Sequence, residues 1–286
     1  MKAIVLAGGK GTRLWPLTAR YSKQLLPVYD KPMIHYSLAT AMHAGIREIL
    51  IVTSSEFLNM YRSQLGDGKD LGIEISYASQ TAPNGIAEGL LIGEKFLNGS
   101  KVLYILGDNI FHGASLGGAL RDYTNVTGAQ IFGYKVSNAT SYGVVEISEN
   151  GQTMSIEEKP VKPRSDLAIP GLYFFDELAV DLAKRIKPSE RGELEITDLL
   201  LEYMKDGKLQ TRVLPRGTVW LDAGTPLDLQ RASNYVQIVE ERQGMKIGCL
   251  EEISYLNGWM DEDQMMKTLA NMPECDYKKY LKKICN

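Results

Sequence analysis

The sequence predicts an α/β fold in which a mostly parallel, mixed sheet of Rossmann-like type is flanked by helices and followed by a helical C-terminal extension. Two observations support this prediction. Short apolar runs alternate with stretches of helical length, as they do in strand–helix–strand units. The run KVLYIL at 101–106 is nearly all apolar, which is typical of a strand covered by helices on both faces.

The first half of the chain contains the regular alternation. The strand predicted at 2–7 leads into a glycine-rich loop. The helix predicted at 33–44 stops before Gly45, the residue type favoured just beyond a helix C-terminus. Further strands are predicted at 48–53, 73–78 and 101–106, and helices at 55–65 and 86–97.

After Ala129 the pattern changes to short β-like runs broken by Gly, Pro and Asn. Such runs either extend the sheet or form a separate lobe. From Pro226 onward the chain is predicted to be mainly helical, and the spacing of Asp261 and Gln264 predicts a capping box at a helix start. Strands are predicted at 130–135, 143–148, 171–175, 209–214 and 218–224, and helices at 177–186 and 195–205.

The charge and cysteine content exclude several classes of protein. The chain has 32 basic and 35 acidic residues, a net charge of −3 and no basic tract, which argues against nucleic acid as a partner. No apolar run approaches the roughly 18 residues that span a bilayer, so we expect no membrane partner. The three cysteines form no CxxC pair, which favours the reduced cytoplasm over a disulfide framework.

The glycine-rich loop LAGGKGTRL directly follows the first strand. Its glycines allow positive φ and close approach by a ligand, and Lys10 and Arg13 add cationic donors, which predicts a cradle for a phosphate. The loop lacks the Walker A pattern, and Leu14 stands where a dinucleotide fingerprint has its third glycine. An ordinary strand–helix turn remains the alternative interpretation.

Two aspartates follow apolar runs at the ends of predicted strands. Asp108 lies in GDN after the run 101–106, and Asp222 lies in VWLDAG. A carboxylate there is costly unless it has a partner, a capping role or a function. Because Mg²⁺ takes one or two protein carboxylates and fills its shell with water and phosphate oxygens, the pair is a candidate magnesium site.

Two further segments carry candidate charged groups. Lys23 lies at a polar-to-apolar junction, where it is either solvated or reaches a phosphate. The segment IEEKP at 156–160 is either a solvated turn or a site in which a carboxylate and Lys159 bind a polar ligand. The three histidines form no metal-ligand pattern, and no GxSxG nucleophile motif is present.

Taken in order, the motifs LAGGKGTRL, SKQLLPVYDKPMI, GDN, EEKP, RGELEITD and WLDAGT resemble those of bacterial sugar-phosphate nucleotidyltransferases. The resemblance runs from Lys2 to about Asn257, and QLLPVYDKPMI, GDGKDLGI and RGELEITD are similar to the subgroup that uses dTTP and glucose 1-phosphate. It implies the Mg²⁺-dependent formation of dTDP-glucose and pyrophosphate, the first step of dTDP-deoxysugar synthesis such as that of dTDP-rhamnose. It also implies a cytoplasmic homotetramer with a regulatory nucleotide site between subunits.

The resemblance also implies roles for individual residues. The glycine-rich loop would wrap the nucleotide, Gln80 and Gly85 would face the base, and Asp108 and Asp222 would bind Mg²⁺. It implies an α/β domain over 1–240, with a nucleotide-binding part at about 1–128 and a sugar-phosphate-binding part at about 129–224, and a helical extension over 241–286. Catalytic roles are implied for Arg13, Lys23, Asp108 and Lys159, and further substrate contacts for Gly8, Gly11, Thr12, Gln24, Asn109, Gly143, Glu158, Ile169, Tyr173 and Arg191.

The implied chemistry needs no general base, since a sugar phosphate is already anionic. The sequence departs from the family pattern at Lys10, at Pro170 and at Glu88, where Gln is common. The last two border base or sugar contacts, so the same reaction with UTP or another nucleotide is the nearest alternative. A nucleotide sensor without catalytic activity and a NAD(P)-dependent oxidoreductase are more distant alternatives.

Overall fold

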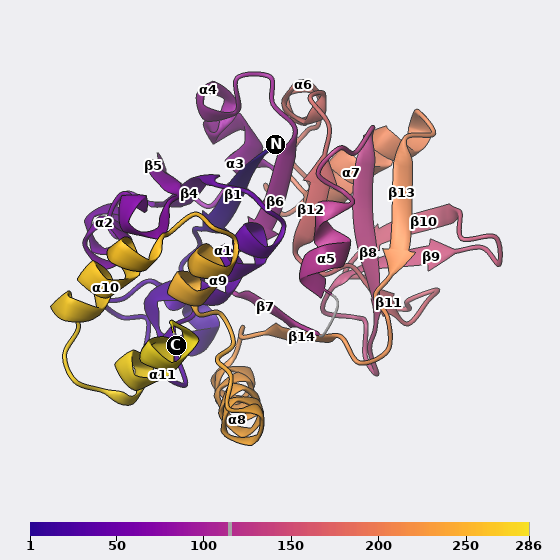
Figure 1. The fold of residues 1–286 in the computed structure, drawn as a ribbon. Helices are drawn as coiled ribbons and strands as arrows, with labels where there is room; N and C mark the ends of the chain where they lie inside the picture. The colour runs from indigo at the N-terminus through magenta and orange to yellow at the C-terminus, as the bar shows by residue number, and fades with distance from the viewer. Residues whose placement is uncertain (114–115, 286) are drawn as a thin grey trace.

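A ten-stranded mixed sheet forms the centre of the computed structural model, which describes residues 1–113 and 116–285 (Figure 1). The strand order is β10-β9-β11-β8-β12-β6-β1-β4-β5, and β13 pairs with β8. The strands of this sheet are β1 (Lys2–Ala7), β4 (Glu48–Ser54), β5 (Glu74–Gln80), β6 (Val102–Leu106), β8 (Ala129–Lys135), β9 (Gly143–Ile147), β10 (Thr153–Glu158), β11 (Leu167–Ala168), β12 (Leu172–Phe175) and β13 (Leu209–Val213).

The predicted fold class is confirmed. Strands β6, β1, β4 and β5 run parallel to one another, as the alternation in the first half predicts. The runs after Ala129 extend this same sheet, because β12 pairs antiparallel with both β6 and β8. Two small ribbons complete the strands: β2 (Pro27–Val28) with β3 (Lys31–Pro32), and β7 (Asn109–His112) with β14 (Val219–Asp222).

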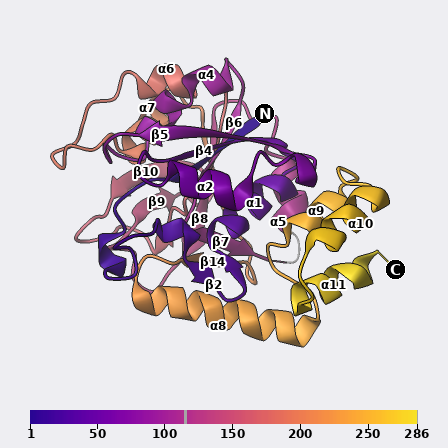
Figure 2. The same cartoon turned by 90° about the vertical axis from the view of Figure 1, so that its left-hand side faces the viewer.

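Helices cover both faces of the sheet, as the views in Figures 1 and 2 show. The helices are α1 (Ile34–His43), α2 (Leu58–Leu65), α3 (Glu88–Ile92), α4 (Glu94–Leu97), α5 (Leu116–Arg121), α6 (Ala179–Ala183), α7 (Ile196–Lys205), α8 (Pro226–Gln243), α9 (Leu250–Leu256), α10 (Glu262–Asn271) and α11 (Asp276–Ile284). Three 3₁₀ turns lie at η1 (Thr12–Leu14), η2 (Lys23–Leu25) and η3 (Lys69–Leu71).

Alternate residues of the central strands enter two separate cores. Val5 of β1 packs in a core that includes side chains of α1 and α9, whereas Ile4 packs in a core that includes side chains of α3, α6 and α7. Both residues are fully buried. This two-sided burial explains why the central strands are almost entirely apolar.

Three helix predictions were too long. The helix predicted at 86–97 is divided into α3 and α4 at Gly93, where a Cβ would lie 2.4 Å from Ile4 Cδ1. The helix predicted at 55–65 begins only at Leu58. The helix predicted at 177–186 ends at Ala183, and Pro188 follows a few residues later and disfavours helix just before it.

The predicted C-terminal helices are present. Gln264 N donates to Asp261 Oδ1 at 2.8 Å, and Asp261 N donates to Gln264 Oε1 at 2.9 Å, so the predicted capping box is confirmed. Figure 2 shows α8 running along one edge of the molecule, with α9–α11 beside α1. In the described ranges, none of the helices is both long and apolar enough to cross a bilayer. The domain boundaries at 128/129 and 240/241 stay a prediction.

Candidate active site

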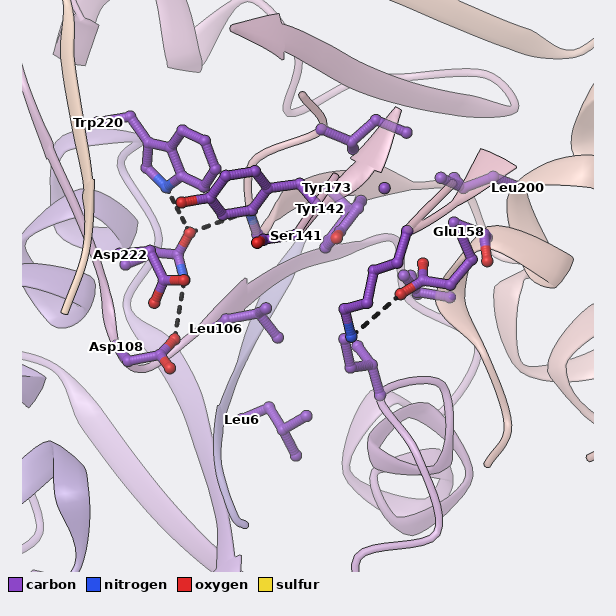
Figure 3. Close-up of a pocket in the computed structure, with 18 of the residues that line it drawn as sticks. Leu6, Leu106, Asp108, Ser141, Tyr142, Glu158, Tyr173, Leu200, Trp220 and Asp222 are labelled. Carbon is purple, nitrogen blue, oxygen red and sulfur yellow. Dashed lines mark hydrogen bonds and ion pairs between the residues drawn. The ribbon is translucent and has the colours of Figure 1, made fainter. Parts of the chain in front are cut away.

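A cavity of about 270 Å³ lies beyond the ends of β1 and β6 and is closed on its other side by β9, β10 and β12 (Figure 3). Parallel sheets bind ligands at this end of their strands. The predicted site residues that line the cavity are Gly8, Arg13, Gln24, Asp108, Asn109, Gly143, Glu158, Lys159, Ile169, Tyr173 and Asp222. An adjoining cavity of about 230 Å³ is lined by Gly11, Thr12 and Lys23 together with Gly8, Arg13, Gln24 and Asp108.

The two aspartates meet although 113 residues separate them in the chain. The β7–β14 ribbon places Asp222 directly opposite Asn109, and Ala223 N donates to Asp108 O at 3.3 Å. Lys23 Nζ forms an ion pair with Asp108 and lies 4.0 Å from Asp222 Oδ1. One ammonium group therefore faces two carboxylates.

The pKa values of the two carboxyl groups are shifted in opposite directions. Burial alone would raise the pKa of Asp108, but the charge and hydrogen bond of Lys23 hold it below its ordinary value. Burial and then the negative charge of Asp108 raise the pKa of Asp222 to about 6. Lys23 and Arg13 both act to lower the pKa of Asp222, so two protein cations already offset part of the negative charge of the pair.

Lys23 and Gln24 are held by the short turn η2. Ser22 Oγ donates to Gln24 Oε1 at 2.9 Å, and the buried Tyr61 hydroxyl donates to the same oxygen at 3.2 Å. Because both contacts use the amide oxygen, the amide NH₂ of Gln24 is directed to other partners. Gln24 lines both cavities, so this group is available to an anionic ligand.

Arg13 and the glycine-rich loop form the wall next to the carboxylates. Gly9 and Gly11 have φ of 92° and 57°, which non-glycine residues rarely adopt. Arg13 follows in η1. A Cβ placed at Gly224 would lie 3.2 Å from Arg13 Nη2 and 3.2 Å from Asp222 Oδ1. The guanidinium group is therefore beside the second carboxylate.

The opposite end of the cavity contains Glu158 and Lys159. The Glu158 side chain lies across the cavity from Asp108 and Asp222 (Figure 3), and Lys159 Nζ is 3.4 Å from Glu158 Oε1. Lys159 has φ of 42°, and its backbone N donates to Tyr142 O at 3.1 Å. This contact holds the turn after β10 against the strand pair, with the ammonium on the cavity wall.

Arg191 lies outside the lining of these two cavities but contacts one of their residues. Its Nη2 lies 2.8 Å from Glu195 and 3.4 Å from Glu158 Oε1. The structure therefore places Arg191 behind Glu158 rather than against the open cavity.

Gln80 and Gly85 lie on the far side of the glycine-rich loop. A Cβ at Gly8 would lie 2.2 Å from Gln80 Oε1, so Gln80 is packed directly behind that glycine. Gly85 has φ of 113°, and a Cβ there would lie 2.4 Å from the backbone of Leu194. No other residue type fits this position without moving the chain.

A nucleotidyl transferase family model matches residues 2–238 of this chain. The chain belongs to the nucleotidyl transferase family. It is 50% identical over 98% of both chains to a glucose-1-phosphate thymidylyltransferase of Neisseria meningitidis, and 46% identical over 98% of both chains to one of Mycobacterium tuberculosis. Because the similarity to named enzymes extends over 98% of this chain, the protein is an enzyme.

Two solved structures are similar to this nucleotidyltransferase. A Bacillus anthracis structure described as a glucose-1-phosphate thymidylyltransferase in complex with a sucrose shares 38% identity and a TM-score of 0.76, over 82% of this chain and 94% of that one. A UDP-glucose pyrophosphorylase structure complexed with UDP-glucose has a TM-score of 0.73 at 24% identity, over 83% and 98%. At that identity the second likeness concerns the fold alone.

The site of this nucleotidyltransferase includes residues that the sequence analysis missed. These residues are uncharged and line the cavity wall: Leu6, Ile86, Leu106, Ser141, Tyr142, Gly171, Ile196, Thr197, Leu200 and Trp220. Trp220 could have been predicted from the sequence, because it lies two residues before Asp222 in the same strand and so points to the same face. The others are ordinary apolar or small residues, and their pattern gives no signal.

The side chain of Asn109 links several parts of the cavity wall by hydrogen bonds. Its Oδ1 accepts from Trp220 Nε1 at 2.6 Å and from Gly171 N at 3.1 Å, and its Nδ2 donates to Asp108 Oδ1 at 2.8 Å. Asn109 is 3% exposed. A single amide therefore fixes β7 against β12 and β14 and orients the first aspartate.

Asn109→Ala should lower the free energy of unfolding by about 2 kcal/mol or more, because it leaves two buried N–H groups without an acceptor. Urea denaturation measures this. The matched control is Asn125→Ala, since Asn125 is exposed and its side chain accepts a hydrogen bond from the Lys101 ammonium at 2.8 Å; it should change stability by less than about 0.5 kcal/mol. Equal losses for the two variants would contradict the role of Asn109.

Proposed function

We propose that this nucleotidyltransferase transfers a thymidylyl group from dTTP to α-D-glucose 1-phosphate, giving dTDP-glucose and pyrophosphate. One observation carries the proposal: a chain 50% identical to a glucose-1-phosphate thymidylyltransferase has a single cavity with paired carboxylates at one end and a lysine–glutamate pair at the other. The first end suits a cation with a polyphosphate, and the second suits a sugar phosphate.

The chemistry is an in-line displacement at the α-phosphorus. An oxygen of the sugar phosphate forms the new bond to this phosphorus, and the bond to the bridging oxygen of pyrophosphate breaks, so pyrophosphate leaves with the electron pair. No proton has to be removed from the nucleophile, which agrees with a cavity that, among the described residues, has no histidine on its wall.

The residues then have separate tasks. Lys159 would hold the nucleophilic phosphate, and Glu158 would accept from sugar hydroxyls. Arg13 would balance the charge on the departing pyrophosphate. The NH₂ of Gln24 would donate to phosphate oxygens beside Lys23.

Asp108 and Asp222 fit a Mg²⁺ ion as ligands. They are two carboxylates facing one ammonium, and no group of three or more His, Cys, Asp or Glu that could hold a metal occurs within residues 1–113 and 116–285. Two protein carboxylates with open positions are what a Mg²⁺–nucleotide site requires. When bound, the ion would neutralise charge between the two anionic substrates.

The remaining features are proposed from the resemblance described above. They are a homotetramer, a cytoplasmic location, and a product that supplies dTDP-deoxysugar synthesis of the dTDP-rhamnose type used in polysaccharides.

A matrix of nucleoside triphosphates against sugar 1-phosphates, followed by pyrophosphate release, tests the proposal. We expect the highest kcat/KM for dTTP with glucose 1-phosphate. UTP should be a weaker substrate, because a single methyl group is worth only about 1–3 kcal/mol in a pocket. Activity confined to ATP or CTP would refute the assignment.

Activity should also depend on pH through Asp222. Because the pKa of Asp222 is raised to about 6, this carboxyl group is protonated below that pH and must lose its proton before it can bind a cation. We expect kcat/KM at limiting Mg²⁺ to fall by up to about tenfold per pH unit below 6.

The profile of Asp222→Asn separates this effect from titration of the substrates. That variant has no carboxyl group to titrate, so its lower residual activity should lack the steep limb below pH 6. An identical limb in both proteins would assign the limb to the substrates and remove Asp222 from the explanation.

A further inference from the structure

A buried pair of hydroxyl groups lies behind the turn that carries Lys23 and Gln24. Tyr61 of α2 is fully buried, and Ser22 is 2% exposed. The Tyr61 hydroxyl lies 2.7 Å from Ser22 Oγ and 3.2 Å from Gln24 Oε1. Tyr61 lines neither of the two cavities of the site. It therefore contacts a residue of the site without contacting the space for the substrates.

The protons of the two hydroxyl groups decide what Gln24 receives. Ser22 and Tyr61 each carry one hydroxyl proton, and burial raises the pKa of Tyr61, so its phenol keeps that proton. If Tyr61 donates to Ser22, then Ser22 donates to Gln24 Oε1, which lies 2.9 Å from its Oγ. If Ser22 donates to Tyr61, then Tyr61 donates to Gln24 Oε1. In both arrangements the amide oxygen of Gln24 accepts a hydrogen bond from behind the cavity wall.

The NH₂ group of Gln24 consequently faces the opposite way. A Cβ at Gly107 would lie 3.1 Å from Gln24 Cγ, so the stem of the side chain is held closely against the end of β6. Among the residues that the structure describes, none accepts a hydrogen bond from Gln24 Nε2. Gln24 lines both cavities, and Lys23 lines the smaller one beside it. The amide thus has its oxygen satisfied by protein and its NH₂ left for a ligand.

The Tyr61 hydroxyl also lies beneath the start of the glycine-rich loop. Thr53 Oγ1, at the end of β4, donates to Ala7 O at 3.1 Å, and the Tyr61 hydroxyl is 3.5 Å from the same carbonyl. Ala7 ends β1 and precedes Gly8, which lines the smaller cavity together with Gln24. Tyr61 is therefore placed behind both walls of that cavity. A buried polar network whose members are all bonded holds its groups in one arrangement.

We propose that Tyr61 is a positioning residue for nucleotidyl transfer: its buried hydroxyl, together with that of Ser22, holds Gln24 with the amide NH₂ turned toward the nucleotide. This inference rests on the proposed transfer from a nucleoside triphosphate. The NH₂ of Gln24 is then a donor already oriented before the nucleotide arrives, so binding does not have to order the side chain. A phenylalanine at position 61 would fill the same space but supply no hydroxyl.

The test is Tyr61→Phe, which removes one oxygen atom and keeps the ring. We expect kcat/KM for dTTP to fall about fivefold or more, because Gln24 loses one of the two hydroxyl groups that hold its oxygen. The KM for glucose 1-phosphate should change by less than about twofold, since Gln24 acts on the nucleotide. Initial rates of pyrophosphate release, with each substrate varied in turn, measure both quantities.

Tyr203→Phe is the matched control. Tyr203 is also fully buried, and its hydroxyl donates to Asp176 Oδ1 at 2.8 Å, but neither residue lines the two cavities. Urea denaturation should show a loss of stability in this variant as in Tyr61→Phe, because each loses a buried hydrogen bond. Only Tyr61→Phe should lower kcat/KM for dTTP. An equal kinetic loss in Tyr203→Phe would assign the effect to general destabilisation and overturn the proposal.

A double-variant cycle shows whether Tyr61 acts through Gln24. In a Gln24→Ala background, Tyr61→Phe should lower kcat/KM for dTTP by less than about twofold, because the amide that it positions is gone. The same loss with and without Gln24 would contradict the proposed role. So would wild-type kinetics in the single Tyr61→Phe variant.

Gln24→Glu tests the orientation itself and does not depend on whether Tyr61→Phe folds. One oxygen of the new carboxylate can accept from Ser22 and Tyr61, and the second then stands where the NH₂ was, with a negative charge toward the phosphates. We therefore expect Gln24→Glu to bind dTTP more weakly than Gln24→Ala. Equal or tighter binding by Gln24→Glu would show that the NH₂ does not face the nucleotide and would overturn the proposal.

Binding measurements keep this inference separate from the proposed function. Calorimetric titration of dTTP without sugar phosphate gives a dissociation constant for the wild type, Tyr61→Phe and Tyr203→Phe, and we expect weaker binding only in Tyr61→Phe. If the wild type used a different nucleoside triphosphate, the thymidylyl assignment would fail. The same three proteins compared with that triphosphate would still support or overturn the role of Tyr61.

Discussion

Asp108→Asn and Asp222→Asn should each lower turnover on the order of a hundredfold or more, a loss typical for removal of a group that balances transition-state charge. Each change removes one of the two carboxylates that face Lys23 in the cavity. An amide keeps the shape of the side chain, so the fold should persist. Steady-state pyrophosphate release measures the loss, and the far-UV circular dichroism spectrum reports the fold.

The double variant shows whether the two aspartates act together. If they hold one Mg²⁺ ion, the double variant should be little worse than the worse single variant, because groups that act as a unit are strongly non-additive. Raised Mg²⁺ should partly restore the single variants. Asp166→Asn is the matched control, since Asp166 pairs with Lys135 on the surface. Independent penalties that multiply would refute a shared ion.

Lys159→Ala should raise the KM for glucose 1-phosphate and lower kcat/KM for it by about tenfold or more, while dTTP binding changes little. The loss corresponds to one charge-assisted hydrogen bond of about 1.5–3 kcal/mol. Lys159 pairs with Glu158, which lies across the cavity from Asp108 and Asp222 (Figure 3). Lys159 has a positive φ, which glycine adopts more readily than other residues. Because alanine keeps a Cβ, Lys159→Ala removes the ammonium group without adding that backbone freedom.

The comparison needs two measurements on the same protein. Calorimetric titration gives the affinity for dTTP, and initial rates give the dependence on glucose 1-phosphate. Lys162→Ala is the control, because Lys162 is an exposed lysine three residues further along the same loop. Equal weakening of both substrates in Lys159→Ala would show that Lys159 does not hold the nucleophile.

The central sheet was predictable because its strands are apolar on both faces. Ile4 and Val5 are both fully buried, in different cores, and such a run has few alternatives to a covered strand. The short strand β7 was not predictable, because Asn109–His112 is only four residues long and its partner β14 lies more than a hundred residues away. Gly93 shows the same limit: a Cβ there would lie 2.4 Å from Ile4 Cδ1, a closeness that the sequence does not reveal.

The charged residues of the candidate site were also predictable, since a buried carboxylate or a glycine-rich loop is unusual enough to be noticed in a sequence. Asp108 and Asp222 are an example. Their positions at strand ends predicted that they lie at a shared edge of the sheet, and in the structure both face the ammonium group of Lys23. The sequence could not show which hydrogen-bonding partners surround these charged residues. The hydrogen bonds that Glu88 accepts from Gln80 and Asn84 are one example, because they are set by a turn whose shape no residue pattern specifies.

The pairing of β7 with β14 has a consequence for the synthesis of the protein. A chain emerges from the ribosome with its N-terminus first, and folding begins before synthesis is complete. The glycine-rich loop and Lys23 are made early, but Asp222 follows only after more than 220 of the 286 residues. Until β14 emerges and pairs with β7, Lys23 faces one carboxylate and the Trp220 side of the cavity is missing. A prematurely terminated chain therefore carries the glycine-rich loop but lacks Asp222, and we expect such incomplete copies to be inactive.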